Sequence, residues 1–230
     1  MIELRNLSKA FHLNGRRKVV ADDLSMVFPS GVSVGLLGRN GAGKSTLLAM
    51  ISGSVDPDRG RIVSTGSISW PVGFRGSFHK DLTGGQNTRF VARIYGVDTD
   101  ELLDFVRDFA ELGEHFDMPV RTYSSGMRSR LSFGLSMGIH FDTYLVDEVT
   151  AVGDAVFRKK SAEVFRDRLS RSGAIVVTHS MSQIRRMCHA AAVLEDGRLE
   201  YFENVEEGIA RHMANMRIAA EVDEELDTED

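Results

Sequence analysis

The sequence has 230 residues, a formal net charge of −5 and a hydrophobic fraction of 42%. This length and composition are typical of one large globular domain, or of one domain with a subdomain. No apolar run approaches the roughly 20 residues of a transmembrane helix, and the first residues lack the hydrophobic segment of a signal peptide, so the sequence predicts a cytoplasmic protein. The one cysteine, Cys188, excludes an internal disulfide and lies on an apolar helical face, which predicts a buried thiol.

The charge is distributed unevenly along the chain. Residues 221–230 contain seven acidic side chains and no basic one, whereas the rest of the chain carries 28 basic and 26 acidic side chains. The body is therefore nearly neutral and lacks a general basic field, so no nucleic acid partner is expected. We predict that the acidic tail is a solvated, mobile end, with a docking role as the alternative.

The N-terminal part predicts β structure. Ile2-Glu3-Leu4 alternates in polarity, as does the stretch from Leu24 to Phe28, and Asn14-Gly15 predicts a turn between the two strands. We expect these strands to form an antiparallel sheet, and Phe11 lies in this segment.

A phosphate-binding loop follows. Val32 to Leu37 predicts a buried strand, residues 38–45 match G-x-x-x-x-G-K-[ST], and residues 46–51 continue as a helix. The glycines let backbone N–H groups converge on an anion at the helix N-terminus. We expect Lys44 to reach the β- and γ-phosphates and the Ser45 hydroxyl to bind Mg²⁺. The residues predicted to bind ATP here are Gly38, Arg39, Asn40, Gly41, Ala42, Gly43, Lys44, Ser45 and Thr46. We expect the N-terminal antiparallel sheet to lie beside this nucleotide, where the ring of Phe11 could stack on the adenine base or belong to the core.

The middle of the chain changes from strands to helices. Arg61-Ile62-Val63 and Ser67 to Trp70 predict short strands, after which apolar residues recur at helical spacing. We predict a mostly helical subdomain at about 74–140, inserted into an α/β domain that spans 1–220, with the acidic tail at 221–230.

Two acids and a histidine follow predicted buried strands. Asp147 and Glu148 end the apolar stretch that begins at Thr143, and His179 ends the next one. Asp147 suits a carboxylate that holds Mg²⁺, and Glu148 suits a general base for the attacking water. His179 could contact the γ-phosphate and orient that water. Since phosphoryl transfer to water depends on positioning and charge stabilisation, no separate protein nucleophile is required.

A short serine-glycine sequence provides a second anion site. Ser124, Ser125, Gly126 and Met127 open a predicted helix, and the free N–H groups of a helix N-terminus favour phosphate. Along the chain, the P-loop is followed by this serine-glycine sequence, then by Asp147-Glu148 and then by His179. These four motifs, in this order, resemble those of the ATP-binding subunits of ABC transporters, over essentially the whole chain. This resemblance implies an α/β fold: a P-loop NTPase core of the ABC ATPase type, an antiparallel β subdomain and an inserted helical subdomain.

The resemblance also assigns further residues. Residues 151–154 correspond to the D-loop, with Asp154 as its acidic residue, and Phe11 corresponds to the aromatic residue that stacks on adenine. The family signature is usually Leu-Ser-Gly-Gly-Gln, whereas residues 123–127 are Tyr-Ser-Ser-Gly-Met. Several stretches look like the polysaccharide-export branch of the family, and within it like the ATPases of capsular polysaccharide exporters. They are the signature, Ser69-Trp70-Pro71-Val72-Gly73-Phe74, Leu82-Thr83-Gly84, Phe109-Ala110-Glu111-Leu112-Gly113 and residues 146–154.

One family motif is missing from its expected place. Gln86 follows Leu82-Thr83-Gly84 and lies too late to be the Q-loop glutamine, so the residue between Trp70 and His79 that would replace it stays open.

The resemblance implies a head-to-tail homodimer in which each ATP lies between the P-loop of one chain and residues 124–127 of the other. It implies ATP hydrolysis to ADP and phosphate at the cytoplasmic face of a bacterial inner membrane. The implied partners are a membrane-spanning permease and, through it, periplasm-spanning export components. An exporter of O-antigen or teichoic acid is the alternative, followed by a non-transport ABC ATPase.

Overall fold

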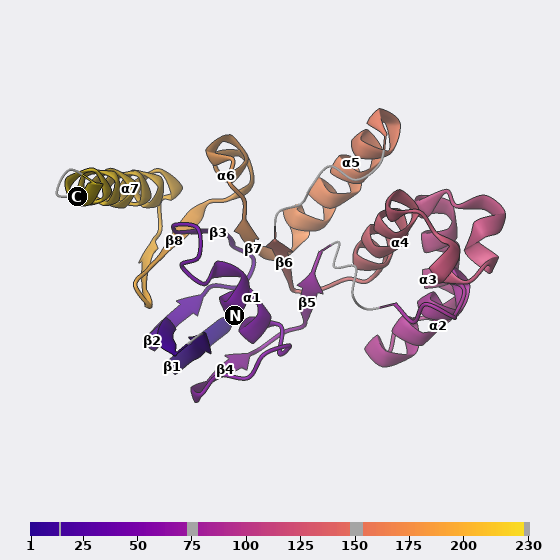
Figure 1. Cartoon of the computed structure of the whole chain (residues 1–230). Helices are drawn as coiled ribbons and strands as arrows, with labels where there is room; N and C mark the ends of the chain where they lie inside the picture. The colour runs from indigo at the N-terminus through magenta and orange to yellow at the C-terminus, as the bar shows by residue number, and fades with distance from the viewer. Residues whose placement is uncertain (14, 73–77, 148–153, 228–230) are drawn as a thin grey trace. The chain divides into compact units, whose positions relative to one another are not determined.

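The computed structural model describes residues 1–13, 15–72, 78–147 and 154–227, and the chain divides into two compact units (Figure 1). The first unit comprises Met1–Ile68, Asp142–Glu148 and Ser172–Asp230. The second unit comprises Ser69–Phe141 and Val149–Arg171. It therefore includes residues 149–171, which the sequence analysis places outside the helical subdomain at 74–140.

An antiparallel sheet begins the first unit. Its strand order is β2-β1-β4, with β1 at Ile2–Leu13, β2 at Arg16–Phe28 and β4 at Arg59–Ser64. The expected pairing of the first two strands is confirmed, but both strands are much longer than predicted. Register shifts between Leu4 and Ala10 interrupt the polar alternation of β1, so a period-2 pattern detects only its first residues.

A second sheet carries the predicted site residues. Within the first unit its order is β6-β7-β3-β8-β9. Strands β6 (Thr143–Asp147), β7 (Gly173–Val177), β3 (Ser33–Leu37) and β8 (Ala190–Glu195) are parallel, and β9 (Arg198–Phe202) pairs antiparallel to β8. Asp196 and Gly197 join β8 to β9, and both residues have positive φ, as a type I′ hairpin turn requires.

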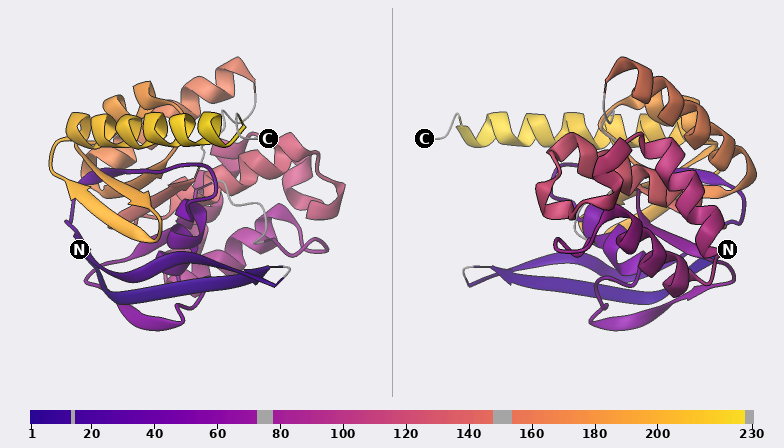
Figure 2. Two further views of the ribbon diagram at one scale, coloured as in Figure 1. Left: turned by 60° about the vertical axis from the view of Figure 1, so that its left-hand side comes forward. Right: turned by 90° about the vertical axis from the view of Figure 1, so that its right-hand side faces the viewer.

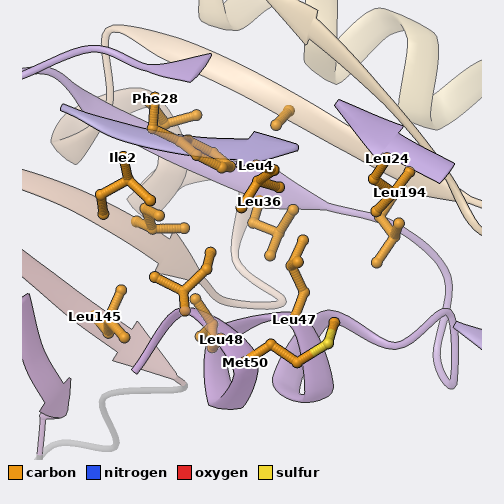
Figure 3. Packing of buried hydrophobic residues seen from close by; sticks show 14 of the residues in the cluster. Ile2, Leu4, Leu24, Phe28, Leu36, Leu47, Leu48, Met50, Leu145 and Leu194 are labelled. Carbon is orange, nitrogen blue, oxygen red and sulfur yellow. The ribbon is translucent and has the colours of Figure 1, made fainter. Parts of the chain in front are cut away.

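One hydrophobic cluster joins both sheets to the first helix, α1 (Lys44–Ile51). Figure 3 shows side chains from β1, β2, β3, β6 and α1 in this cluster. Leu36, Leu47 and Leu48 are completely buried. Since burying one such side chain contributes about 1.5–3 kcal/mol, the cluster fixes the strand and helix on either side of the P-loop.

The C-terminal part of the first unit contains α6 (Met181–Met187) and α7 (Val205–Asp227). Ser180 caps α6, and Cys188, which follows it, is buried as predicted; burial raises the pKa of its thiol to about 12. Helix α7, yellow in Figure 2, packs against β8 and β9, and its C-terminal part reaches beyond the hairpin. It extends to Asp227, so seven of the ten residues predicted to form a mobile tail are helical.

Strand β5 (Ile68–Pro71) carries the chain from the first unit into the second, which is built from helices. They are α2 (Gly84–Tyr95), α3 (Thr99–Ala110), α4 (Ser125–Gly138) and α5 (Ala155–Arg171), with 3₁₀ turns η2 (Gly113–Asp117) and η3 (Val120–Thr122) before α4. Phe109 joins three of the helices, since its ring stacks on Phe105 and Phe133 and meets the edge of Phe157. Among the described residues, no helix combines the length and the apolar character needed to cross a bilayer.

Candidate nucleotide-binding site

The loop between β3 and α1 has the backbone of a phosphate-binding loop. Gly41 and Gly43 have φ of 78° and 105°, in the left-handed region that favours glycine. A Cβ on Gly43 would also lie 2.2 Å from Cγ1 of Val20, so no larger residue fits there. The Lys44 ammonium donates hydrogen bonds to the carbonyl oxygens of Gly38 and Arg39, at 2.7 and 2.9 Å. The loop therefore holds its own lysine at the start of α1.

A cavity of about 350 Å³ in the first unit brings nine of the predicted site residues together. Its lining includes Asp147 and His179 with the P-loop. The predicted residues that line it are Phe11, Asn40, Gly41, Gly43, Lys44, Ser45, Thr46, Asp147 and His179.

Parallel strands explain why residues so far apart in sequence meet here. Asp147 ends β6, His179 follows β7 by two residues and the P-loop follows β3. Strand β7 pairs with both β6 and β3, so the carboxyl ends of all three strands lie at one edge of the sheet. Ligands of open parallel sheets bind at this edge.

Phe11 lies at the cavity and not in the core. The side chain is 37% exposed, which contradicts the alternative that it is a core aromatic. The Lys9 ammonium lies 5.4 Å from the centre of its ring, and Lys9 is itself held by Asp58 at 2.8 Å. An exposed aromatic ring at the rim of a phosphate-binding cavity suits stacking on a base.

Three residues of the predicted phosphate-binding loop do not line this cavity. Gly38 and Arg39 line a neighbouring cavity of about 460 Å³, which shares Asn40, Lys44 and His179 with the first, and Ala42 lines neither. Glu148, the predicted base, and residues 151–153 of the predicted D-loop lie outside the described residues. The predicted Q-loop segment overlaps residues 73–77, which are also outside the described part.

The cavities contain residues that the sequence analysis missed. Lys18 and Val20 come from β2, Val177 from β7 and His212 from α7. No motif marks them, because they are brought to the P-loop only by strand pairing and by the packing of α7 against β3 and β8.

The two residues predicted to bind Mg²⁺ fit a magnesium ion by their chemistry. Ser45 supplies a hydroxyl oxygen and Asp147 a carboxylate, and both line the same cavity. Mg²⁺ bound to nucleotides keeps several waters and needs only one or two protein oxygens.

His212 of α7 is buried beside the P-loop lysine. Its side chain is 8% exposed, and its Nδ1 atom has no hydrogen-bond partner among the described residues. Burial lowers the pKa of His212 below its usual value; the charge of Lys44 lowers it further, and that of Glu195 opposes the shift. The imidazole is therefore neutral near pH 7 in the folded chain.

We expect the free energy of unfolding to fall as the pH drops below about 6.5, the ordinary pKa of histidine. Below that pH the unfolded chain binds a proton at residue 212 that the folded chain does not yet bind. Thermal melts at pH 7.5 and 5.5 should show a smaller pH effect for His212→Gln than for the parent. His189→Gln is the control, since His189 is exposed. An equal pH effect in all three proteins would contradict this role of His212.

The signature residues lie in the second unit, at the start of α4. Ser124 is the N-cap, and its hydroxyl accepts a hydrogen bond from the N–H of Met127 at 3.2 Å. Ser124, Ser125 and Gly126 are exposed, and the space around Gly126 is open. This segment therefore presents a helix N-terminus to a ligand or partner, which is the geometry that anion binding uses.

Asp154 has a local structural role. Its carboxylate accepts hydrogen bonds from the N–H groups of Val156 and Phe157, which caps α5, and it pairs with Arg130 at 2.7 Å. The hydrogen bond from Phe157 and the charge of Arg130 lower the pKa of Asp154. A D-loop role of Asp154 stays a prediction.

Comparison with known proteins places the chain in a family. Residues 21–151 match the sequence profile described as ABC transporter. The chain is 50% identical over 212 residues to the polysialic acid transport ATP-binding protein KpsT of Escherichia coli, covering 91% of this chain and 95% of KpsT. It is 46% identical to the capsule polysaccharide export ATP-binding protein CtrD of Neisseria meningitidis serogroup B, covering 90% of this chain and 95% of CtrD.

The fold agrees with a solved structure. The ATP-binding cassette MJ0796, in a dimeric post-hydrolysis state bound to ADP and Pi, matches with a TM-score of 0.72 and 19% identity, over 89% of this chain and 99% of that one. This likeness confirms the predicted fold of an ABC ATPase, with its antiparallel β subdomain and helical insert. From the match to the family profile and the near-complete coverage of relatives at 46–50% identity, the chain belongs to the ABC transporter family, as an ATP-binding subunit.

Proposed function

We propose that this chain is the ATPase of a transporter that exports a capsular polysaccharide. The main observation that supports ATPase activity is one cavity that the P-loop, Asp147 and His179 line together. The substrate class is supported by KpsT and CtrD, whose names specify polysialic acid transport and capsule polysaccharide export.

The chemistry assigned to the cavity is hydrolysis of ATP to ADP and phosphate. Lys44 offsets the negative charge of the phosphates, and Ser45 and Asp147 would hold the Mg²⁺ that accompanies the nucleotide. His179 contacts the γ-phosphate and helps to orient the water, and Glu148 accepts its proton. The ion, when bound, neutralises charge on the phosphates; the protein supplies the positioning.

A second copy of the chain is proposed to complete each site. The P-loop cavity is open to solvent along its lining residues Gly41 and Ser45, which are exposed, and the signature segment is also exposed. In a head-to-tail dimer, Ser125 and Gly126 of one chain would cover the γ-phosphate bound to the other. The dimeric state of the MJ0796 structures supports such a pairing.

A permease is the proposed membrane partner. In the second unit, Phe90, Ile94 and Tyr95 on α2 are 56%, 61% and 42% exposed and border an apolar groove with Trp70. Exposed apolar surface of this kind marks protein contacts. A peripheral position at the cytoplasmic face of the bacterial inner membrane, and contact with periplasm-spanning components through the permease, follow from this partner.

Export can be tested in the bacterium that carries the gene. A strain whose only copy encodes Lys44→Ala should lose surface capsule, measured by antibody or dye binding, and should accumulate the polymer inside the cell. Lys159→Ala, at an exposed position on α5, should leave the capsule at parental level.

The same strain separates the alternatives. Lipopolysaccharide and wall teichoic acid should be unchanged in the Lys44→Ala strain. An intact capsule together with a lost O-antigen or teichoic acid would show that the chain serves that other polymer. No change in any surface glycan would contradict an export function.

A further inference from the structure

We propose that Lys18 is a second cation for the phosphate chain of the nucleotide, in addition to the P-loop lysine. The residue is on β2, where no phosphate-binding motif predicts it. The inference rests on ATP binding at the P-loop cavity and does not depend on which polymer is exported.

The β1–β2 pairing brings Lys18 to the nucleotide cavity. Lys18 is the cross-strand partner of Phe11, and both side chains line the cavity that contains the P-loop. Directly opposite residues of an antiparallel pair have their Cβ atoms about 4.5–5.5 Å apart on the same face. The side chains of Lys18 and Phe11 therefore leave the β1–β2 pair on the same face, toward the cavity.

The ammonium of Lys18 reaches the P-loop itself. Its Nζ atom lies 3.2 Å from the position that a Cβ on Gly41 would occupy. Since Gly41 has no side chain, a cation can come this close to the loop backbone. In a nucleotide whose base stacks on Phe11 and whose terminal phosphates lie in the P-loop, the phosphates next to the ribose lie between Phe11 and the loop.

Lys18 has no competing partner in the described part of the chain. Its ammonium makes no ion pair or hydrogen bond there, whereas neighbouring Lys9 is bound to Asp58 at 2.8 Å and Lys44 to two loop carbonyls. The side chain is exposed, so it approaches a phosphate without first breaking an internal contact. A mobile lysine next to polyphosphate acts as a point charge and forms charge-assisted hydrogen bonds.

Lys44 and Lys18 would bind different phosphates because they lie at different places in the cavity. Lys44 is held at the helix N-terminus, where the terminal phosphates bind. Lys18 is on the strand position opposite Phe11 and would bind an oxygen of the α- or β-phosphate. This contact would fix the part of the nucleotide between its base and its γ-phosphate.

The test is binding of ADP and of a non-hydrolysable ATP analogue with Mg²⁺, measured by calorimetry. Lys18→Met should weaken both about tenfold, and Lys18→Arg should stay within about twofold of the parent. Arg17→Met is the matched control: Arg17 is an exposed cation on the same strand, pairs across to His12 and does not line the cavity. It should also stay within about twofold.

Two further measurements identify what Lys18 touches. Inorganic tripolyphosphate, which has no base, should lose the same fold of affinity in Lys18→Met. The affinity of the parent should also fall more steeply with NaCl concentration than that of Lys18→Met, because one charge contact is absent in the variant.

Unchanged ADP affinity in Lys18→Met, at an unchanged melting temperature, would overturn the proposal. So would a loss for ADP without a loss for tripolyphosphate, because Lys18 would then act on the nucleoside. Binding of nucleotide by the parent without export in cells would leave this result valid and would count against the proposed transport function alone.

Discussion

Replacing Lys44 by alanine should weaken ATP binding by at least about tenfold. Lys44 is the first residue of α1, and it lines the cavity together with Asn40 and Ser45. A hydrogen bond to a charged group contributes about 1.5–3 kcal/mol, and each 1.4 kcal/mol is a factor of ten in affinity. The variant loses this cation where the terminal phosphates bind, and Lys18, at the rim, cannot replace it there.

The measurement is calorimetric titration with a non-hydrolysable ATP analogue and Mg²⁺. Lys159→Ala is the matched control, because it removes an exposed lysine from α5 in the second unit. Lys44→Ala also removes the hydrogen bonds to the carbonyls of Gly38 and Arg39, so its melting temperature should be recorded alongside. Parental affinity in a folded Lys44→Ala protein would contradict the assignment of the cavity.

The parts of the fold that sequence predicts well are those with an uninterrupted local pattern. Strands β3, β6 and β7 are short, buried and mostly apolar runs, and the structure places them as neighbours. The pattern of β1 is interrupted, because register shifts and the positive φ of Asn6 break the alternation. Helix α7 continues through the acidic segment, which a composition argument assigns to a mobile tail.

The residues of the site also differ in how well they can be predicted from sequence. The P-loop is one contiguous segment whose glycine spacing reports its backbone, so its residues are predictable from sequence. Lys18 and His212 reach the same place through strand pairing and helix packing, and a lysine or histidine in such a segment has no local feature that distinguishes it. The exposure of Phe90 and Ile94 was also not predictable, since helical periodicity shows that residues share a face but not whether that face is covered.

Replacing Glu148 by glutamine should abolish turnover while ATP binding persists. Glutamine keeps the size of the side chain but cannot accept the proton of the attacking water. General base catalysis typically contributes about 10²- to 10⁴-fold, so phosphate release should fall by at least about a hundredfold. The binding groups Lys44 and Ser45 are untouched, and the affinity for ATP should stay within about threefold of the parent.

The variant should also accumulate as a dimer when ATP and Mg²⁺ are present. If ATP holds two chains together and hydrolysis separates them, a chain that binds without hydrolysing stays closed. Light scattering after size exclusion should then give a dimer for Glu148→Gln with ATP and a monomer with ADP. Glu163→Gln is the matched control, because Glu163 is an exposed acid on α5. It should release phosphate at the parental rate.

Phosphate release tests Glu148 as the general base, and the oligomeric state tests closure of the dimer by the signature segment. Parental phosphate release by Glu148→Gln would show that another group accepts the proton. Loss of turnover with the chain still monomeric on ATP would keep Glu148 as the base but contradict closure by the exposed signature segment. Adding Gly126→Asp to Glu148→Gln tests that segment directly, because a carboxylate at the open position beside Ser124 would repel the γ-phosphate of the facing chain. The double variant should bind ATP but fail to dimerise.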